Sequence, residues 1–334
     1  MIRVTSMGRK PPASAREGLT ATVLRRWCEP DVILVVTNLH DEEPLMPHVI
    51  RQARKSGAKV LLAHVAHPIR QPSSNVLRYP SGRTISSAHR PQAVLERMTR
   101  QLQWEGIPCE LVLLTGLAEE EIPALARSCS VDRVILTTHG DRVAGRFNER
   151  WIAERLLPAL EVPVCVIGRC VPVRSRHEKP TGRVSLAMSL QSNCDACLGF
   201  ASRFAQGYHA QLTVLHVSGA RAEDDLPMAR EPGAAAAHIP ESALVEAGLW
   251  CPLDIAVRQG DPAGEILKYN STTEKDFLIL GASGTPVPRT ESVSLIQKVV
   301  SEARCPVIVL SVAIANESSS LTRLSSGASA SCSW

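Results

Sequence analysis

Apolar runs alternate with amphipathic segments along most of this chain. Val32 to Thr37 is almost continuously apolar, which is typical of a strand covered on both faces of a sheet. Glu43 to Ser56 then has a helical period, and Lys59 to Val65 is a second apolar run. Strands that alternate with helices of about ten residues predict parallel strands joined by right-handed crossovers. The expected fold class is therefore α/β, a doubly wound sheet with helices on both faces.

The alternation continues to residue 169 and starts again at residue 183. Short apolar runs predict strands, and longer segments with a period near 3.6 predict helices. In the first half the further strands are Cys109–Leu114, Arg133–Thr137 and Val164–Ile167, and the further helices are Ala93–Trp104, Ala118–Ser128 and Trp151–Leu160. In the second half the strands are Val184–Met188, Gln211–Val217, Leu253–Arg258, Phe277–Leu280 and Val307–Ser311, and the helices are Asp195–Gln206, about 239–248, Ala263–Tyr269 and Ser292–Ala303.

The two halves are copies of one unit. Val131–Gly140 is an apolar run that ends in a small-residue turn, and Lys275–Gly284 repeats it 144 positions later. His64 and His216, which each follow an apolar run, lie 152 positions apart. Such differences in spacing can be placed in loops, which tolerate insertions and deletions. The sequence therefore predicts two similar domains in tandem.

The domains are expected at 29–169 and 183–313, and three segments lie outside them. Residues 1–28 are rich in Arg, Ser and Thr, and predict a flexible or helical N-terminal extension. Residues 170–182 carry Arg, Lys, Pro and Gly, and form the linker. Residues 314–334 are Ser-rich and have no hydrophobic period, which predicts a disordered tail.

Composition excludes two classes of partner. Of the 334 residues, 44% are hydrophobic and 21% are charged, which is ordinary for a soluble globular protein. The net charge of +4 is too small to indicate a nucleic-acid surface. No apolar run approaches the ~18 residues of a membrane span. We therefore expect a cytoplasmic protein that binds neither nucleic acid nor membrane.

The ten cysteines are scattered mostly singly, which is typical of reduced thiols in a reducing compartment. Cys194 and Cys197 have CxxC spacing near the start of a predicted helix. This pair is either a redox or metal-binding site or two ordinary thiols on a helix. Because the chain has no second CxxC and no histidine pair nearby, we favour ordinary thiols and expect no metal site.

Both halves carry the same short motifs in the same order. They are Gly116–Ile122, Thr137–Gly140 and Ala153–Leu157 in the first half, and Gly260–Leu267, Asp276–Gly284 and Val299–Leu310 in the second. Together they resemble the universal stress protein (UspA) family, of the tandem two-domain type. The resemblance implies two flavodoxin-like (adenine nucleotide alpha hydrolase-like) domains, each a five-stranded parallel sheet with helices on both faces. It also implies pairing of the two domains within the chain and frequent homodimerisation.

ATP-binding members of that family carry Gly-x-x-Gly, a later Gly-Ser or Gly-Thr, and an aspartate at the tip of the first strand. The glycines let backbone N–H groups approach the phosphates. In the first domain only Gly140 of these glycines remains, and Trp151 stands where a small hydroxyl would meet phosphate. Asn38 replaces the aspartate. The first domain therefore has only weak candidate ligand contacts, which are Asn38, His139 and Gly140.

The second domain keeps more of this pattern, although Pro286 and Pro288 remove amide donors from its loop. The tip of its first strand is a serine, and another serine lies near the start of the following helix. Such a serine either caps the helix or meets a phosphate. The candidate contacts for ATP or AMP in this domain are Ser189, Gly281, Ser283, Gly284 and Ser294.

We expect a tandem universal stress protein with a non-catalytic, regulatory or protective role in the stress response and degenerate nucleotide sites. His64 and His216 invite a catalytic interpretation, but we expect both to be hydrogen-bonded residues at strand ends. No catalytic residue and no firmly bound cofactor are expected, and the partner is an unidentified protein. The alternative is an ATP- or AMP-binding switch, or a weak ATPase, that uses the Gly281-x-x-Gly284 loop.

Overall fold

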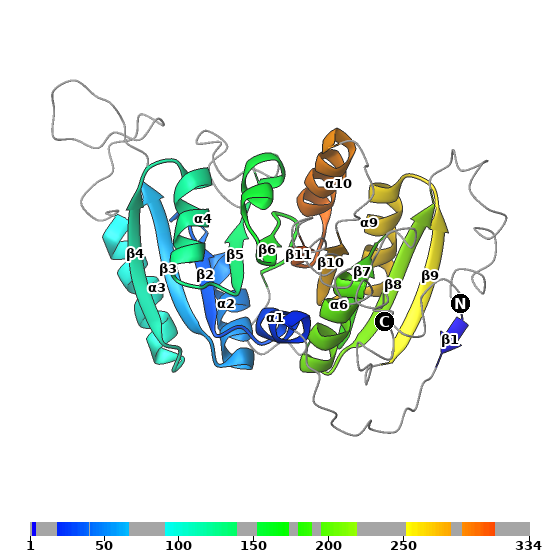
Figure 1. The fold of residues 1–334 in the computed structure, drawn as a ribbon, viewed down its shortest axis with the longest axis horizontal. Coiled ribbons are helices and arrows are strands. Elements are labelled where there is room, and N and C mark those ends of the chain that lie inside the picture. Colours follow the sequence, from blue (N-terminus) through cyan, green and yellow to red (C-terminus); the bar gives the residue numbers. More distant parts are fainter. Residues whose placement is uncertain are drawn as a thin grey trace, which may run out of the picture. The chain divides into compact units, whose positions relative to one another are not determined.

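The computed structural model describes residues 2–4, 19–39, 41–66, 91–138, 152–173, 180–188, 195–218, 252–281 and 289–310. The chain divides into two compact units. The N-terminal unit contains residues 29–180 and 293–308, and the C-terminal unit contains 1–28, 181–292 and 309–334. Strands and helices alternate along the chain in both units (Figure 1). The predicted α/β fold class is confirmed.

The sheet of the N-terminal unit is parallel, with the order β4-β3-β2-β5-β6. Its central strand pairs on both sides, so that Val35 lies opposite Leu62 on one side and Ile135 on the other. These side chains are fully buried, as near-continuous apolar runs require in a sheet covered on both faces. The strands are β2 (Val32–Val36), β3 (Lys59–Ala66), β4 (Cys109–Thr115), β5 (Arg133–Thr137) and β6 (Val164–Ile167).

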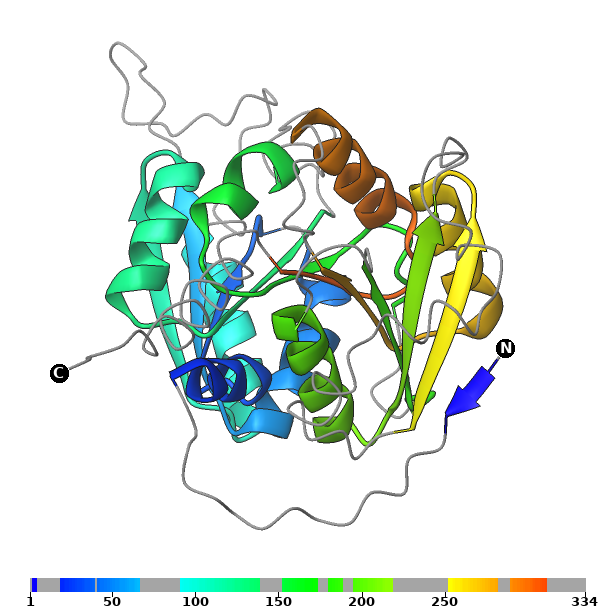
Figure 2. The same ribbon diagram turned by 45° about the vertical axis from the view of Figure 1, so that its right-hand side comes forward.

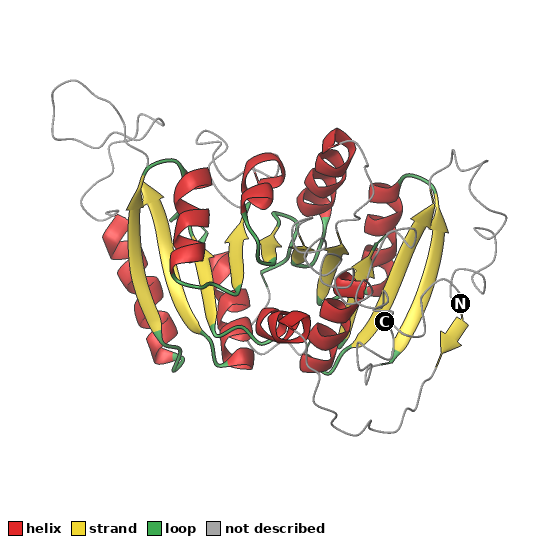
Figure 3. Ribbon diagram, in the orientation of Figure 1, coloured by secondary structure: helices red, strands yellow, loops and turns green. Residues whose placement is uncertain are grey.

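Helices cover both faces of this sheet. One face carries α4 (Ala118–Ser128), and the other carries α2 (Glu42–Ser56) and α3 (Pro91–Trp104), as Figures 1 and 3 show. Helix α2 ends where Gly57 adopts a φ of 72° and its N–H donates to the Ala53 carbonyl, a conformation that glycine adopts without strain.

The predicted helix Trp151–Leu160 is helical in its described part, but it is not a regular α-helix. The described part of this segment is a π-helix, η2 (Ile152–Leu156), followed by a 3₁₀ turn, η3 (Leu157–Ala159). Pro158 has no N–H to donate to the carbonyl four residues earlier, so a regular α-helical ladder cannot continue through it. The chain instead changes its hydrogen-bond spacing and leaves the helix within one turn.

The sheet of the C-terminal unit has the order β1-β9-β8-β7-β10, with β11 next to β10. Strands β9, β8, β7 and β10 pair in parallel, and β1 runs antiparallel to β9. The five-strand count expected for each domain is not confirmed, because β1 was not predicted and the boundary between the units falls within β11. The strands are β1 (Ile2–Val4), β7 (Arg183–Ala187), β8 (Gln211–Ser218), β9 (Leu253–Gln259), β10 (Phe277–Gly281) and β11 (Val307–Leu310).

The described helices of the second half are α6 (Asp195–Gly207), α9 (Pro262–Thr273) and α10 (Arg289–Glu302). Helix α1 (Leu19–Cys28) packs beside α6 (Figures 1 and 2). The Cys28 thiol donates to the Phe200 carbonyl at 3.5 Å. A Cβ on Gly199 would lie 3.2 Å from Leu24 Cδ1, so the two helices approach closely there. The N-terminal extension therefore contains a helix that packs within the C-terminal unit.

The aspartate that opens each repeated motif is structural. Asp132 accepts hydrogen bonds from the backbone N–H groups of Asp31 and Val32, at 2.9 and 3.1 Å. Its counterpart Asp276 accepts from the backbone before β7, most closely from Gly182 at 2.7 Å. Both carboxylates thus fix the start of the first strand of their repeat and lie at the opposite end of the sheet from any ligand site expected of this fold.

The predicted helix at about 239–248, residues 174–179 of the linker and the 314–334 tail lie outside the described residues. In the part of the chain that is described, no helix combines the length and apolar character needed to span a bilayer.

Candidate functional site

In an open α/β sheet, ligands bind beyond the carboxyl ends of the strands, near the point where the strand order reverses. In the N-terminal unit that point lies between β2 and β5, which neighbour each other at the centre of the sheet. The residues that follow these strands are Thr37 and Asn38 after β2, and Thr138 after β5. This strand-end region is the candidate site of the N-terminal unit.

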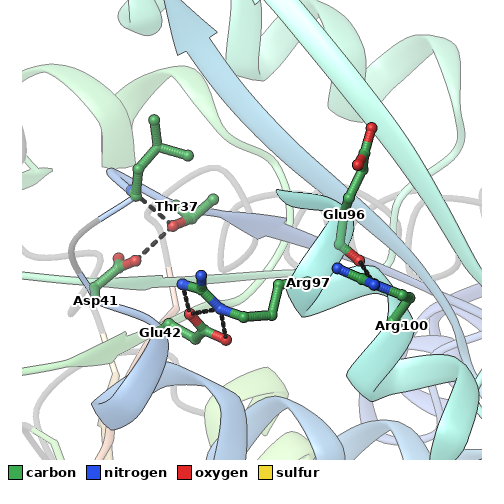
Figure 4. Close-up of polar contacts among 7 residues, drawn as sticks. Thr37, Asp41, Glu42, Glu96, Arg97 and Arg100 are labelled. Atoms are coloured by element: carbon green, nitrogen blue, oxygen red, sulfur yellow. Dashed lines mark hydrogen bonds and ion pairs between the residues drawn. The ribbon is translucent and has the colours of Figure 1, made fainter. Parts of the chain in front are cut away.

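A short hydrogen-bonded loop connects β2 to α2 in this region (Figure 4). The Thr37 hydroxyl donates to Asp41 Oδ1 at 2.5 Å and itself accepts from the backbone N–H of Leu39 at 3.0 Å. The backbone N–H of Asn38 donates to Asp41 Oδ2 at 3.5 Å. Leu39 has a φ of 74°, which a leucine rarely adopts. The side chains therefore bond to the loop itself and hold it in a strained turn.

Asp41 is a buried carboxyl, 1% exposed. Burial raises its pKa from 3.8 to about 7, although the hydrogen bonds from Thr37 and Asn38 act in the opposite direction. The ATP-binding motif of the family has its aspartate at the tip of the first strand, where this chain has Asn38. The motif therefore does not identify Asp41. Asp41 comes immediately before Glu42 and Glu43, and the three acids together are typical of a helix start. No signal in the sequence separates the buried carboxyl from the two that follow it.

His64 faces the same strand end from β3. Its Nδ1 lies 2.9 Å from the Thr37 carbonyl oxygen, so Nδ1 must donate, and the ring is 4% exposed. In the second repeat His216 Nδ1 lies 3.4 Å from the Met188 carbonyl oxygen, and burial lowers its pKa. Both rings tie the end of one strand to the next, which is the structural role expected for them.

Thr138 has a hydroxyl buried without a hydrogen-bond partner in the described part of the chain, and the residue is 5% exposed. A buried hydroxyl in this state costs about 1–3 kcal/mol relative to a satisfied one. The two candidates that follow it, His139 and Gly140, lie outside the described residues. Of the candidates of the first domain, the structure thus places Asn38, whose backbone N–H is directed at Asp41.

In the second repeat the structure places Gly281 and Ser294, while Ser189, Ser283 and Gly284 lie outside the described residues. Ser294 is exposed in α10. A Cβ added to Gly281 would lie 3.0 Å from Cys197 Sγ and 3.2 Å from Cys197 Cβ. The glycine is therefore explained by the close approach of α6 to the end of β10, without a phosphate.

The same contact bears on the CxxC pair. Cys197 is 4% exposed and packs against the end of β10, which is typical of an ordinary buried thiol. Cys194 lies outside the described residues. Across the described ranges, no group of three or more His, Cys, Asp or Glu side chains is placed to hold a metal ion.

We expect Gly281→Ala to lower the free energy of unfolding by about 1–3 kcal/mol, because the new methyl group overlaps Cys197 in a packed interior. Gly207→Ala is the matched control, since a Cβ there meets no atom within 4 Å. Urea unfolding followed by circular dichroism compares the two variants. An unchanged midpoint for Gly281→Ala would show that the close approach does not explain this glycine.

Two comparisons with known proteins extend this description. The model of the Universal stress protein family matches residues 30–168 and 181–311. No curated protein matches the chain in sequence. The two matched regions contain every described strand except β1, and α1 also lies outside them.

Among solved structures, a universal stress protein from Archaeoglobus fulgidus aligns over 85% of this chain and 97% of its own, with a TM-score of 0.56 and 16% identity. A functionally unknown protein from Pseudomonas aeruginosa PAO1 aligns over 90% of this chain and 99% of its own, with a TM-score of 0.58 and 14% identity. At these identities the likeness establishes the tandem fold alone. A universal stress protein solved in complex with cAMP matches only 41% of this chain, with a TM-score of 0.32, which carries no inference about ligands here.

Proposed function

Because this chain belongs to the universal stress protein family, we propose that it is a non-catalytic tandem member whose nucleotide sites are degenerate in both repeats. It acts in the cytoplasm as a regulatory or protective protein of the stress response. It does so through protein contacts, with its two repeats paired in one chain.

One observation carries this proposal, and it lies at the end of β2. There the Asp41 carboxyl is buried and bonded to Thr37. To meet the sugar or base of a nucleotide, this carboxyl would have to break that bond and leave its buried position. Exchanging one satisfied buried bond for another brings little net free energy. The polar groups at the end of β2 therefore stabilise the loop between β2 and α2 rather than bind a nucleotide.

The second repeat supports the same conclusion from a different contact. Gly281 is the first glycine of the Gly-x-x-Gly segment, and a Cβ there would lie only 3.0 Å from Cys197 Sγ. The loop that follows contains Pro286 and Pro288, which offer no N–H to a phosphate. Of the residues that keep the similarity to an ATP-binding loop, Gly281 is thus one that packing alone can account for.

The rival proposal is an ATP- or AMP-dependent switch, or a weak ATPase, that uses Gly281-x-x-Gly284 and Ser294. One structural observation favours a ligand in the other repeat. The Thr138 hydroxyl, which has no hydrogen-bond partner among the described residues, lies at the end of β5 and would gain a bond from a ligand group placed there. A nucleotide function would therefore more readily involve the N-terminal unit than the glycine segment itself.

Isothermal titration calorimetry of the full chain with ATP and with AMP separates the two proposals. We expect no binding heat at millimolar ligand. Binding with a micromolar dissociation constant would overturn the non-catalytic, ligand-free proposal. Two variants then locate the site: loss of binding in Thr138→Val places it in the N-terminal unit, and loss in Gly284→Trp places it in the second repeat.

A further inference from the structure

Strand β4 forms an open edge of the N-terminal sheet. Among the described strands it pairs only with β3, from Val60 opposite Cys109 to Ala66 opposite Thr115. It is seven residues long, contains a single charged residue, Glu110, and has no proline. Leu113 is 52% exposed on it. Apart from Glu110, this edge has none of the devices by which proteins prevent strand pairing, since it contains no lysine, no proline and no bulge.

The hydrogen bonds to β3 show which backbone groups of β4 face outward. Val60 N–H donates to the Pro108 carbonyl at 2.8 Å, and Gly116 N–H donates to the Ala66 carbonyl at 3.1 Å. Residues 108 and 116 thus face β3, and alternation along the strand gives the same direction to residues 110, 112 and 114. The N–H and C=O groups of residues 109, 111, 113 and 115 therefore point to the open edge.

The equivalent edge of the second repeat is covered. Strand β9 corresponds to β4 at the 144-residue spacing, and it has the same hydrogen-bond phase, since Leu212 N–H donates to the Pro252 carbonyl. Strand β1 pairs with β9 in antiparallel orientation, with Ile2 opposite Ile255 (Figure 1). Ile255 is buried, 6% exposed. The protein thus demonstrates, on its own β9, that this edge accepts an antiparallel strand.

The surface between the β4 edge and α3 is hollowed and carries both polar and apolar side chains. A cavity of about 330 Å³ is lined by Leu111 of β4 and by Glu96, Thr99 and Arg100 of α3. Leu113 lies on the same face of the strand as Leu111, because alternate residues share a face. Trp104 at the end of α3 is 90% exposed. An added strand would therefore meet the exposed Leu113 side chain and an open cavity beside its backbone partner.

We propose that β4 binds the β4 of a second copy of this chain, as a two-fold antiparallel pair centred on Val112. Only the odd-numbered residues of β4 direct their backbone N–H and C=O groups outward, so odd-numbered residues must lie opposite odd-numbered residues in the pair. A two-fold axis at Val112 meets this condition and pairs all seven residues of the strand. Leu111 then lies opposite Leu113, and Glu110 lies opposite Leu114, so no like charges meet. Glu110 remains beside Lys59, its ion-pair partner within the chain. The interface uses the same patch on both copies, as two-fold symmetry demands.

The first test is the oligomeric state of the full chain in solution. Sedimentation velocity is expected to show a monomer and a dimer whose ratio depends on protein concentration. Leu113→Lys should remove the dimer, because it places a charge in the centre of the pair. Val173→Lys is the matched control and should leave the dimer unchanged, since Val173 is similarly exposed, at 53%, but lies outside β4.

The second test fixes the register by disulfide cross-linking. Val112 would meet the Val112 of the other copy in a non-hydrogen-bonded pair, where Cα atoms lie about 4.5 Å apart, within reach of a disulfide. Oxidised Val112→Cys is therefore expected to give a covalent dimer, and oxidised Leu114→Cys no more than the unmodified protein. A monomer at every concentration would overturn the proposal. So would a dimer that survives Leu113→Lys, or one that Val4→Pro abolishes, because the donated strand would then be β1.

Discussion

Asp41→Asn should remove a large pH-dependent loss of stability from the N-terminal unit. Burial raises the pKa of Asp41 to about 7, so the folded state holds this proton more tightly than the unfolded chain does. The associated stability is present below the ordinary pKa of 3.8 and is lost as the pH rises through about 7. Between about pH 5 and pH 8 the wild type should lose about 2–3 kcal/mol relative to the asparagine variant. Urea unfolding of both proteins at several pH values measures this difference.

The comparison with asparagine isolates the carboxyl from other groups that titrate in the same range. His216 has a lowered pKa, so its own contribution to stability is gained as the pH rises, which is the opposite sign. Both proteins contain it, and it cancels in the difference. Thr37→Val is a second control, because removing its hydroxyl takes away a bond that lowers the Asp41 pKa and should raise that pKa further. Parallel pH profiles for wild type and Asp41→Asn would contradict the assignment.

Phe277→Ala should destabilise the C-terminal unit by about 3–5 kcal/mol, the range found for removing a buried aromatic ring. Phe277 is fully buried at the start of β10. Its ring centroid lies 5.0 Å from that of Phe204 and 5.1 Å from that of Tyr208, both in edge-on arrangements. The alanine variant loses these contacts and leaves a cavity. Hydrogen exchange measured by mass spectrometry should report faster exchange of the amides in β10.

The other repeat provides a comparison for this prediction. At the position equivalent to Phe277 it has Arg133, 1% exposed, whose Nη1 donates to Gln52 Oε1 at 3.0 Å. Gln52 in turn corresponds to Phe204. One repeat thus joins its first helix to its fourth strand with a polar pair, and the other does so with an aromatic pair. Phe277→Leu, which keeps most of the apolar volume, should cost less than Phe277→Ala. Equal losses for the two variants would mean that ring contacts are not what stabilises this unit.

Much of the fold follows from hydrophobic patterning. The bounds of β5, β6 and α4 agree with the predicted ones, and the other predicted strands differ from the observed ones by one residue at one or both ends. A strand covered on both faces must be apolar at nearly every position, so its sequence marks its length directly. The repeat supplied a second, independent copy of each pattern.

Three features could not be predicted because each depends on how segments of the chain pack or bond in three dimensions. Strand β1 is too short to show a period, and only its pairing with β9 makes it a strand. The turn type of Ile152–Leu156 depends on how the chain accommodates Pro158. The burial of Asp41 depends on how β2 and α2 pack, which three consecutive acids do not reveal. In the candidate site, the same limit applies to Gly281, whose packing on Cys197 required the position of α6.

The division of the chain into units has a consequence for how the protein is made. The N-terminal unit includes residues 293–308, and the C-terminal unit includes residues before Glu29. During synthesis, the N-terminal unit cannot be completed until almost the entire polypeptide has left the ribosome, although domains generally fold in order as they emerge. A fragment that stops at the linker would lack part of its own unit. Expression of either half alone should therefore yield an incomplete, aggregation-prone product, and boundaries for shorter versions are better chosen from the units than from the repeats.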